Sequence, residues 1–345
     1  MLKIKVMKQL IFNIFAMVIL LFHTSTLSQD KIQFEPSRDA YGHPDLQGNW
    51  TNRLATPFER PSNLGEQATY SQEEANQLKQ SLIEDVSLKA APIDPNRAAP
   101  DSSDGVDQSS EDIFTPEITE LLMIEGEYRT SIITDPPTGR LPRQAAWMMN
   151  DHYGQLRKLA TGNADGPELR PPGERCLSVW GPLPPLGGRP LESPNYKIVQ
   201  TPTHIVFYQE LGGTSRIIKM NGNKFPENIP QWQGDSVGYW DNDTLIVETD
   251  NINPLESIFY VPLSREFSVK EEFKLVSNNE ILYKFTVEDP VIYTSSFSGE
   301  VILSRMPQGD KIYEYSCHEG NYSLPGILAG ARRQEMESKL KEEPN

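Results

Sequence analysis

From Tyr196 onward, hydrophobic and polar residues alternate along the chain with the period of two that is typical of half-buried β-strands. Short polar turns at residues 241–243 and 277–279 separate alternating segments, and such turns favour hairpins. Because consecutive strands with short links pair with their neighbours, the pattern predicts a mainly β protein, an antiparallel meander that forms a barrel or a curved sheet. The expected strands cover residues 196–201, 203–210, 214–220, 237–241, 243–249, 267–275, 280–288, 299–305 and 311–317.

The N-terminal half is expected to supply helices and long loops that pack on the barrel. Ser71 and Glu74 have the spacing of a capping box, which predicts a helix over residues 71–89. Weaker patterns predict further helices at residues 114–129 and 145–160.

Two short strands are expected within this half. Gly48 and Trp50 lie in a predicted strand near residues 46–52, and the Gly-x-Trp pair resembles the first strand of lipocalin-like barrels. Residues 132–140 have the pattern of a strand that ends in a Pro/Gly turn. The loop at residues 161–194 is rich in Pro and Gly, and a loop of that length in a compact protein is usually functional or disordered.

The first residues have the pattern of a secretory signal. Three lysines precede an apolar run at residues 10–22, and small residues follow up to Ser28. The run is too short to span a bilayer comfortably, so we expect cleavage after Ser28 and a periplasmic or secreted protein. A retained N-terminal anchor is the alternative. The expected parts of the chain are a signal peptide at 1–28, helices and loops at 29–195, the barrel core at 196–330 and a charged tail at 331–345.

The charge balance and the missing motifs narrow the classes of function. The chain has 32 Lys and Arg against 48 Asp and Glu, a net charge of −16. Such a charge repels nucleic acids and anionic membranes, so we expect neither nucleic-acid binding nor membrane insertion after signal cleavage. The sequence has no phosphate loop, dinucleotide fingerprint, Gly-x-Ser-x-Gly or His-Glu-x-x-His motif. Serine-hydrolase, nucleotide-dependent and zinc-protease functions are therefore disfavoured. No cofactor is expected, and the oligomeric state stays open.

The chain has two cysteines, Cys176 and Cys317. An exported protein with a small, even number of cysteines usually pairs them, so we predict a disulfide between these two. A thiol or metal site formed by Cys317 and His318 is the alternative. The spacing of cysteines and histidines matches no recognised zinc motif, and no metal is expected.

The densest group of polar and aromatic residues is at 313–322. His318 is the obvious candidate for proton transfer, because its ordinary pKa is near 6.5. Glu319 and Asn321 could orient a ligand, and Tyr322 could transfer a proton. The structural alternative is a C-terminal strand fixed by a disulfide, with His318 bonded to a loop.

Further candidates lie elsewhere in the sequence. Trp232 and Asp235 fall in a cluster that suits sugar stacking and hydrogen bonding, although the Trp could equally be core. Arg175 and Arg216 are candidates for carboxylate binding, and a disulfide would bring Arg175 beside His318. His204 is a second candidate base, although a single histidine on a strand is more often structural.

Several motifs resemble landmarks of a large group of exported bacterial proteins. They are PDLQGNW at 44–50, DPPTGR at 135–140, ERC at 174–176, IVQTP at 198–202, WQGDS at 232–236 and YEYSCHEGNY at 313–322. Within this resemblance, the chain is similar to oligosaccharide dehydratases of ulvan degradation. The resemblance implies an oligosaccharide substrate with a non-reducing-end glucuronic acid. It also implies loss of water to leave a 4,5-unsaturated uronic acid.

Such an elimination needs three kinds of group, and the candidates supply each. Arg175 or Arg216 would stabilise charge that develops on the carboxylate. A base, one of His318, His204 and Tyr322, would remove the proton at C5. Tyr322 or Glu319 would protonate the departing hydroxyl. Two other functions remain open: a glycoside hydrolase with paired carboxylates, and a β-barrel that binds a ligand without catalysis.

Overall fold

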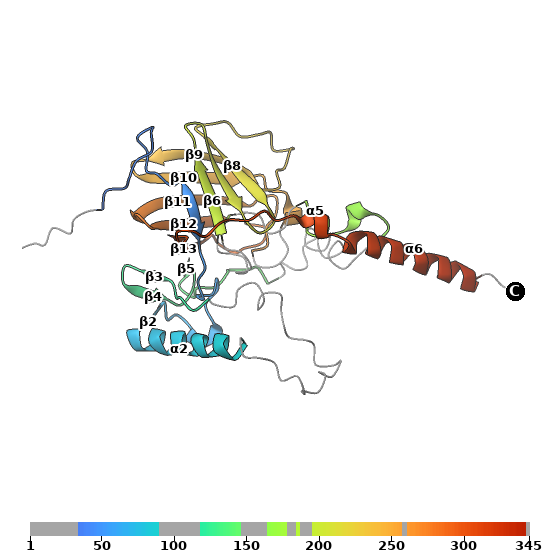
Figure 1. Ribbon diagram of the computed structural model, residues 1–345, viewed down its shortest axis with the longest axis horizontal. Coiled ribbons are helices and arrows are strands. Elements are labelled where there is room, and N and C mark those ends of the chain that lie inside the picture. The colour runs from blue at the N-terminus through green and yellow to red at the C-terminus, as the bar shows by residue number, and fades with distance from the viewer. Residues whose placement is uncertain are drawn as a thin grey trace, which may run out of the picture. The chain divides into compact units, whose positions relative to one another are not determined.

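The structure, a computed structural model, describes residues 34–89, 118–145, 164–177, 184–186, 195–256 and 261–342 (Figure 1). Its main feature is a closed barrel of nine strands, in which neighbours pair in the order β1-β6-β7-β8-β9-β10-β11-β12-β13 and β13 pairs back onto β1. The predicted mainly β barrel fold is confirmed. The strands are β1 (Gly48–Thr51), β6 (Asn195–Gln200), β7 (His204–Gln209), β8 (Thr214–Met220), β9 (Asp235–Asp241), β10 (Thr244–Asp250), β11 (Ser268–Ser277), β12 (Glu280–Glu288) and β13 (Phe297–Arg305).

One pairing in the barrel departs from the expected antiparallel meander. Strands β8 and β9 are parallel, with Ile218 opposite Ser236, whereas the other pairings of the barrel are antiparallel. Parallel neighbours need a connection that returns along the barrel. Residues 221–234 make this connection, which we call the crossover.

The opening strand predicted near residues 46–52 is confirmed as β1, and it closes the barrel. Trp50 lies opposite Tyr196 of β6 and opposite Arg305 of β13. The Trp50 side chain is fully buried, and its indole N–H donates to the carbonyl oxygen of Leu46 at 2.8 Å. The guanidinium of Arg305 lies 4.2 Å from the centre of the indole ring. Gly48 has a φ of +133°, a backbone conformation that residues with a side chain rarely adopt, which accounts for the glycine of the Gly-x-Trp pair.

Aromatic side chains fill the interior of the barrel. Phe207, Phe273, Tyr283, Phe285 and Phe297 are each at most 2% exposed. Their rings form a continuous chain of contacts, with centroid separations from 4.8 to 6.3 Å. The space in which a lipocalin-type carrier would hold its ligand is therefore occupied by side chains.

The N-terminal half contains one of the predicted helices and a small sheet. Helix α2 (Gln72–Lys89) is confirmed together with its capping box: the Ser71 hydroxyl accepts from the Glu74 N–H, and the Glu74 carboxylate accepts from the Ser71 N–H. These bonds, first of all the backbone one, lower the pKa of Glu74. The predicted strand at 132–140 is confirmed as β5 (Ile133–Asp135), which pairs with β13.

The helix predicted at residues 114–129 is wrong for the described part of that range. Strands β3 (Met123–Ile124) and β4 (Glu127–Arg129) form a hairpin there, and β4 also pairs with β2 (Thr69–Tyr70). Glu125 and Gly126 both have positive φ, the conformation of a tight hairpin turn, which ends any helix. Nearly all of the helix predicted at 145–160 and the signal peptide at 1–28 lie outside the described residues.

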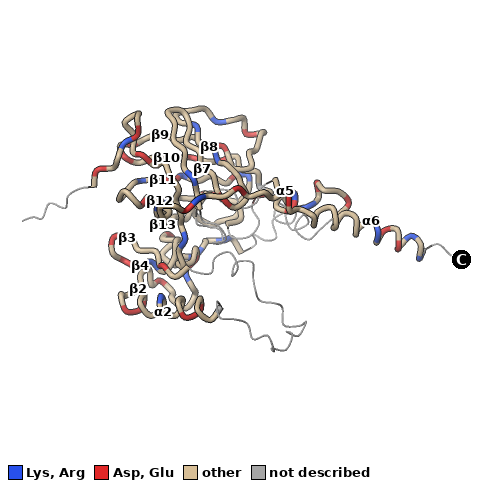
Figure 2. The backbone as a smooth tube through the Cα atoms, in the orientation of Figure 1, with Lys and Arg blue, Asp and Glu red and all other residues tan. Residues whose placement is uncertain are grey.

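The strand predicted at residues 311–317 is also wrong. Residues 306–316, which we call the strap, contain a turn at 308–309 and do not join the sheet, and helix α5 (Cys317–Gly320) follows. Because β1 pairs with both β6 and β13, the described strands of the barrel form a closed ring, and this segment does not add to it. The charged tail expected at 331–345 belongs to helix α6 (Ser323–Glu342), which begins before residue 331. Its charged residues lie toward its C-terminal end, where basic and acidic pairs follow one another (Figure 2).

Within the described ranges, no helix has the length and apolar character needed to cross a membrane.

Candidate functional site

A disulfide between Cys176 and Cys317 is present, as predicted, with the two Cα atoms 5.8 Å apart. It joins residues 164–177, which we call the proline-rich segment, to the start of α5. Adjacent Cα atoms are about 3.8 Å apart, so the Cα atoms of Arg175 and His318 lie at most about 13 Å from each other. The disulfide therefore places the backbone of Arg175 and that of His318 in the same region of the structure.

The proline-rich segment is fixed by further contacts. Arg170 makes a bidentate ion pair with Glu174, with N–O distances of 2.7 and 2.8 Å, and this hydrogen bonding raises the pKa of Arg170. Arg332 of α6 donates to the carbonyl oxygens of Ala164 and Asp165. The segment is thus held by its own ion pair, by α6 and by the disulfide.

Arg175 differs from Arg170 and Arg332 in that its side chain is not engaged by other described residues. Its backbone N–H donates to the carbonyl oxygens of Pro171 and Pro172. Its side chain is partly exposed and has no hydrogen-bond or ion-pair partner among the described residues. An unpaired guanidinium on a fixed backbone is suited to bind a carboxylate in the planar, bidentate manner of arginine.

Three of the predicted proton-transfer residues surround the same disulfide. His318, Glu319 and Tyr322 lie in or directly after α5, and all three are exposed, Tyr322 by 82%. Their side chains make no hydrogen bond or ion pair within the described part of the chain. They are therefore available to a ligand that approaches Arg175 from solvent.

Asn321 belongs to this cluster but has a structural task. Its amide nitrogen donates to the carbonyl oxygen of Glu174 at 2.7 Å. Its amide oxygen accepts from the Leu324 N–H at 3.3 Å, at the beginning of α6. Because both ends of the amide are occupied, Asn321 positions α5 against the proline-rich segment and has little left for a substrate.

His204 lies elsewhere. It begins β7, whose opposite end leads to Glu210, and the Glu210 carboxylate accepts from the strap N–H of Tyr313. At about 3.3 Å per residue, the two ends of β7 are roughly 17 Å apart. The exposed His204 ring lies 3.0 Å from the Thr203 hydroxyl. The structure therefore does not bring His204 together with His318.

Arg216 is in the core of the barrel and is 0% exposed. Its guanidinium makes a two-point ion pair with the equally buried Glu271. Further bonds run to the hydroxyls of Ser236 at 2.9 Å and Thr249 at 2.6 Å. Tyr283 donates to Glu271 at 2.8 Å, and burial, reinforced by that carboxylate, raises the Tyr283 pKa well above its usual range. This closed network stabilises the barrel, and no substrate at the surface can reach Arg216.

Trp232 and Asp235 belong to the crossover and the start of β9. Asp235 is 2% exposed, forms an ion pair with Lys219 at an N–O distance of 2.7 Å, and accepts a hydrogen bond from the N–H of Phe225. It therefore fixes the crossover to β8. Trp232 is partly exposed. The crossover leaves β8 at the end opposite to Gly213, beside which the strap passes. These two residues are not part of the cluster at the disulfide.

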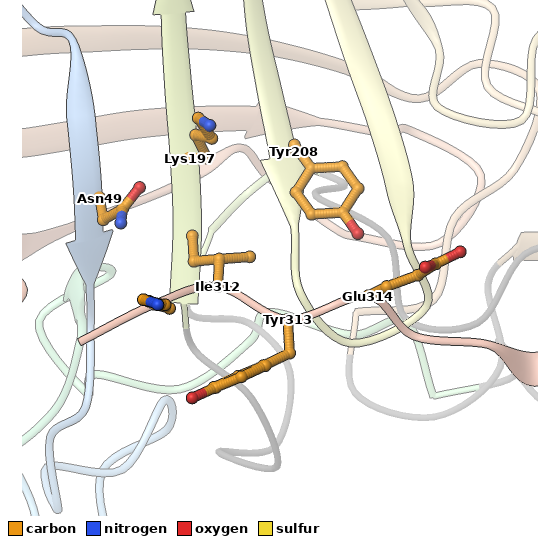
Figure 3. Close-up of a pocket in the computed structure, with 7 residues that line it drawn as sticks. Asn49, Lys197, Tyr208, Ile312, Tyr313 and Glu314 are labelled. Carbon is orange, nitrogen blue, oxygen red and sulfur yellow. The ribbon is translucent and has the colours of Figure 1, made fainter. Parts of the chain in front are cut away.

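A groove that the sequence analysis missed lies between the strap and the outer face of the barrel (Figure 3). It has a volume of about 490 Å³ and is lined by Asn49, Lys197, Tyr208, Lys311, Ile312, Tyr313 and Glu314. The alternation of β6 and β7 correctly points Lys197 and Tyr208 outward. The incorrect strand at 311–317 concealed the groove, because a segment that joins the sheet cannot lie across its face.

The described residues contain no group of three or more His, Cys, Asp and Glu that could hold a metal ion. In comparisons with known proteins, the chain matches no protein-family model and no curated protein.

Proposed function

We propose that the protein is an exported carbohydrate-active dehydratase. It would remove water from the non-reducing-end glucuronic acid of ulvan-type oligosaccharides and leave a 4,5-unsaturated uronic acid. The observation that carries the proposal is the disulfide, because it ties the backbone beside Arg175 to the helix that contains the exposed His318. The guanidinium of Arg175 has no partner among the described residues. The choice of substrate comes from the resemblance of the chain to oligosaccharide dehydratases of ulvan degradation.

Each of these residues has one part in the elimination. Arg175 binds the uronic acid carboxylate and stabilises the negative charge that spreads onto it as the C5 proton leaves. Neutral His318 takes that proton. Tyr322 donates its proton to the C4 hydroxyl, with Glu319 as the alternative acid. The C5–H and C4–O bonds break, the C4–C5 double bond forms, and water leaves. Proton return from His318 to Tyr322 through solvent restores both groups, so no oxidant or reductant is needed.

Export is part of the proposal. Residues 1–28 have the pattern of a cleavable secretory signal, which would deliver the protein to the periplasm or the medium. The disulfide supports this location, because disulfides persist in oxidising compartments and are rare in the cytosol. Since the disulfide also organises the cluster, the location and the activity depend on the same bond.

The structure favours the dehydratase over the two other functions. A glycoside hydrolase needs two available carboxylates about 5–10 Å apart. Near the disulfide, among the described residues, Glu319 is available, whereas Glu174 is engaged by Arg170. A carrier of the lipocalin type would use the barrel interior, which aromatic side chains fill.

The proposal is tested by incubating the purified protein with oligosaccharides that end in glucuronic acid. We expect the ultraviolet absorbance of a conjugated double bond to appear, and mass spectrometry to show loss of one water from a chain of unchanged length. The control substrate has its terminal carboxylate reduced to an alcohol, which leaves Arg175 no anion to bind, and it should stay unchanged. Chain cleavage with the same absorbance would indicate a lyase instead. If no unsaturated product forms from any uronic-acid substrate, the proposed elimination is refuted.

A further inference from the structure

The groove under the strap is a preformed feature of the surface. Its floor is a row of cross-strand neighbours on the outside of the barrel: Asn49 lies opposite Lys197, and Lys197 lies opposite Tyr208. The strap forms its other wall (Figure 3). Because the floor is made of paired β-strands, the positions of these three side chains are set by the barrel itself.

The strap is held at three points. At its start, the N–H of Met306 donates to the carbonyl oxygen of Asn49 at 2.9 Å. In the middle, the N–H of Tyr313 donates to the Glu210 carboxylate at 2.8 Å. At its end, Cys317 is tied to the proline-rich segment by the disulfide. The groove therefore keeps its width without a ligand.

The charge of the groove is unusual for this acidic protein. Lys197 and Lys311 both line it, and neither has an ion-pair partner in the part of the chain that the structure describes. Most other described lysines are paired with a carboxylate, as Lys219 is with Asp235. In the view of Figure 3, the Tyr208 ring lies between Lys197 and Glu314. Two free ammonium groups beside a tyrosine ring suit an anion carried on a flat, hydroxylated ring.

We propose that this groove binds an anionic group, a carboxylate or a sulfate, on a sugar unit some distance along the chain from the one that reacts. The inference rests on the proposed function for the ligand being an oligosaccharide. The strap connects the groove directly to the disulfide cluster, since Glu314 and His318 are four residues apart. An oligosaccharide lying along the strap would therefore place one end at Arg175 and His318 and an inner unit against the two lysines.

The test measures binding by isothermal titration calorimetry at low ionic strength, because salt screens exposed charges. The full-length mature protein carries His318→Gln so that turnover does not disturb the titration. Three probes are compared: oligogalacturonate for carboxylates, a sulfated carrageenan oligosaccharide for sulfates, and a neutral cello-oligosaccharide. The double substitution Lys197→Ala and Lys311→Ala is compared with Lys274→Ala, an exposed lysine of β11 that does not line the groove.

We expect the double substitution to weaken binding of at least one anionic probe by about tenfold, the effect of two exposed charge contacts, and to reduce the salt dependence. Lys274→Ala should leave binding unchanged. The stronger anionic probe identifies the bound group as carboxylate or sulfate. The inference is overturned if no anionic probe binds, if the double substitution leaves anion binding intact, or if the neutral probe binds as well as the anionic ones. If the lysines are needed for binding but no unsaturated product forms, the groove proposal is supported and the dehydratase proposal is refuted. If product forms and the lysine substitutions leave KM unchanged, the dehydratase proposal is supported and the groove proposal is refuted.

Discussion

Replacing His318 with glutamine is expected to lower the rate of unsaturated product formation by about 10²- to 10⁴-fold, the usual contribution of a general base. Glutamine keeps much of the size and hydrogen bonding of histidine but cannot take the C5 proton. The exposed position of His318 means that the substitution removes no packing, so the barrel and the disulfide should form normally. Initial rates are measured from the ultraviolet absorbance of the product, and circular dichroism confirms the fold.

His204→Gln is the matched control for this prediction. His204 is also an exposed histidine, but it lies at the end of β7 that is remote from the strap. Its substitution should leave the rate within about twofold, as expected for a surface residue outside the site. Loss of activity in His204→Gln together with normal activity in His318→Gln would place the base elsewhere and contradict the assignment.

Replacing Arg216 with methionine is expected to lower the free energy of unfolding by about 3–5 kcal/mol, because it leaves the buried Glu271 carboxylate without its counter-ion. Both side chains are 0% exposed, and the ion pair is bonded to Ser236, Thr249 and Tyr283 at the centre of the barrel. The measurement is unfolding in urea, with the slope compared between variants to check that the transition stays two-state.

Two further variants distinguish the loss of this ion pair from the destabilisation that any substitution can cause. Replacing Arg216 with methionine and Glu271 with leucine together should recover most of the loss, because no unpaired charge then remains in the core. Lys270→Met, which removes an exposed lysine of the same β11 strand, should change stability by no more than about 0.5 kcal/mol. A small effect of Arg216→Met would show that Glu271 takes up a proton at little cost and that the ion pair is dispensable.

The barrel strands could be predicted closely because each has one face toward the core. The expected strands at 214–220 and 280–288 match β8 and β12 to the residue. Alternation of hydrophobic and polar residues indicates which face of a strand is buried. It does not indicate whether the neighbouring strand runs parallel or antiparallel, so the parallel pairing of β8 and β9 could not be predicted. Residues 311–317 have the pattern of a strand because hydrophobic and polar residues alternate there as well.

The alternation along β8 and β11 also indicates that Arg216 is buried. On a strand, Arg216 shares a face with Ile218, and Glu271 shares one with Val269 and Phe273. A charge on each of two apolar faces predicts an ion pair inside the barrel. The sequence also allows an ion pair between Arg216 and Glu210 on neighbouring strands, but the structure pairs Arg216 with Glu271. The disulfide could be predicted from the count of cysteines, and with it the approach of Arg175 to His318. The groove could not, because it depends on how the strap crosses the closed barrel.

The most direct test of the central claim, that Arg175 and His318 form one elimination site, is the rate of the double variant Arg175→Gln with His318→Gln. Residues that act together on one transition state have strongly non-additive effects. We therefore predict that each single variant loses most of the activity and that the double variant is scarcely slower than the more damaged single one. The claim would be contradicted if the double variant lost activity by the product of the two single losses. It would also be contradicted if either single variant kept the wild-type rate.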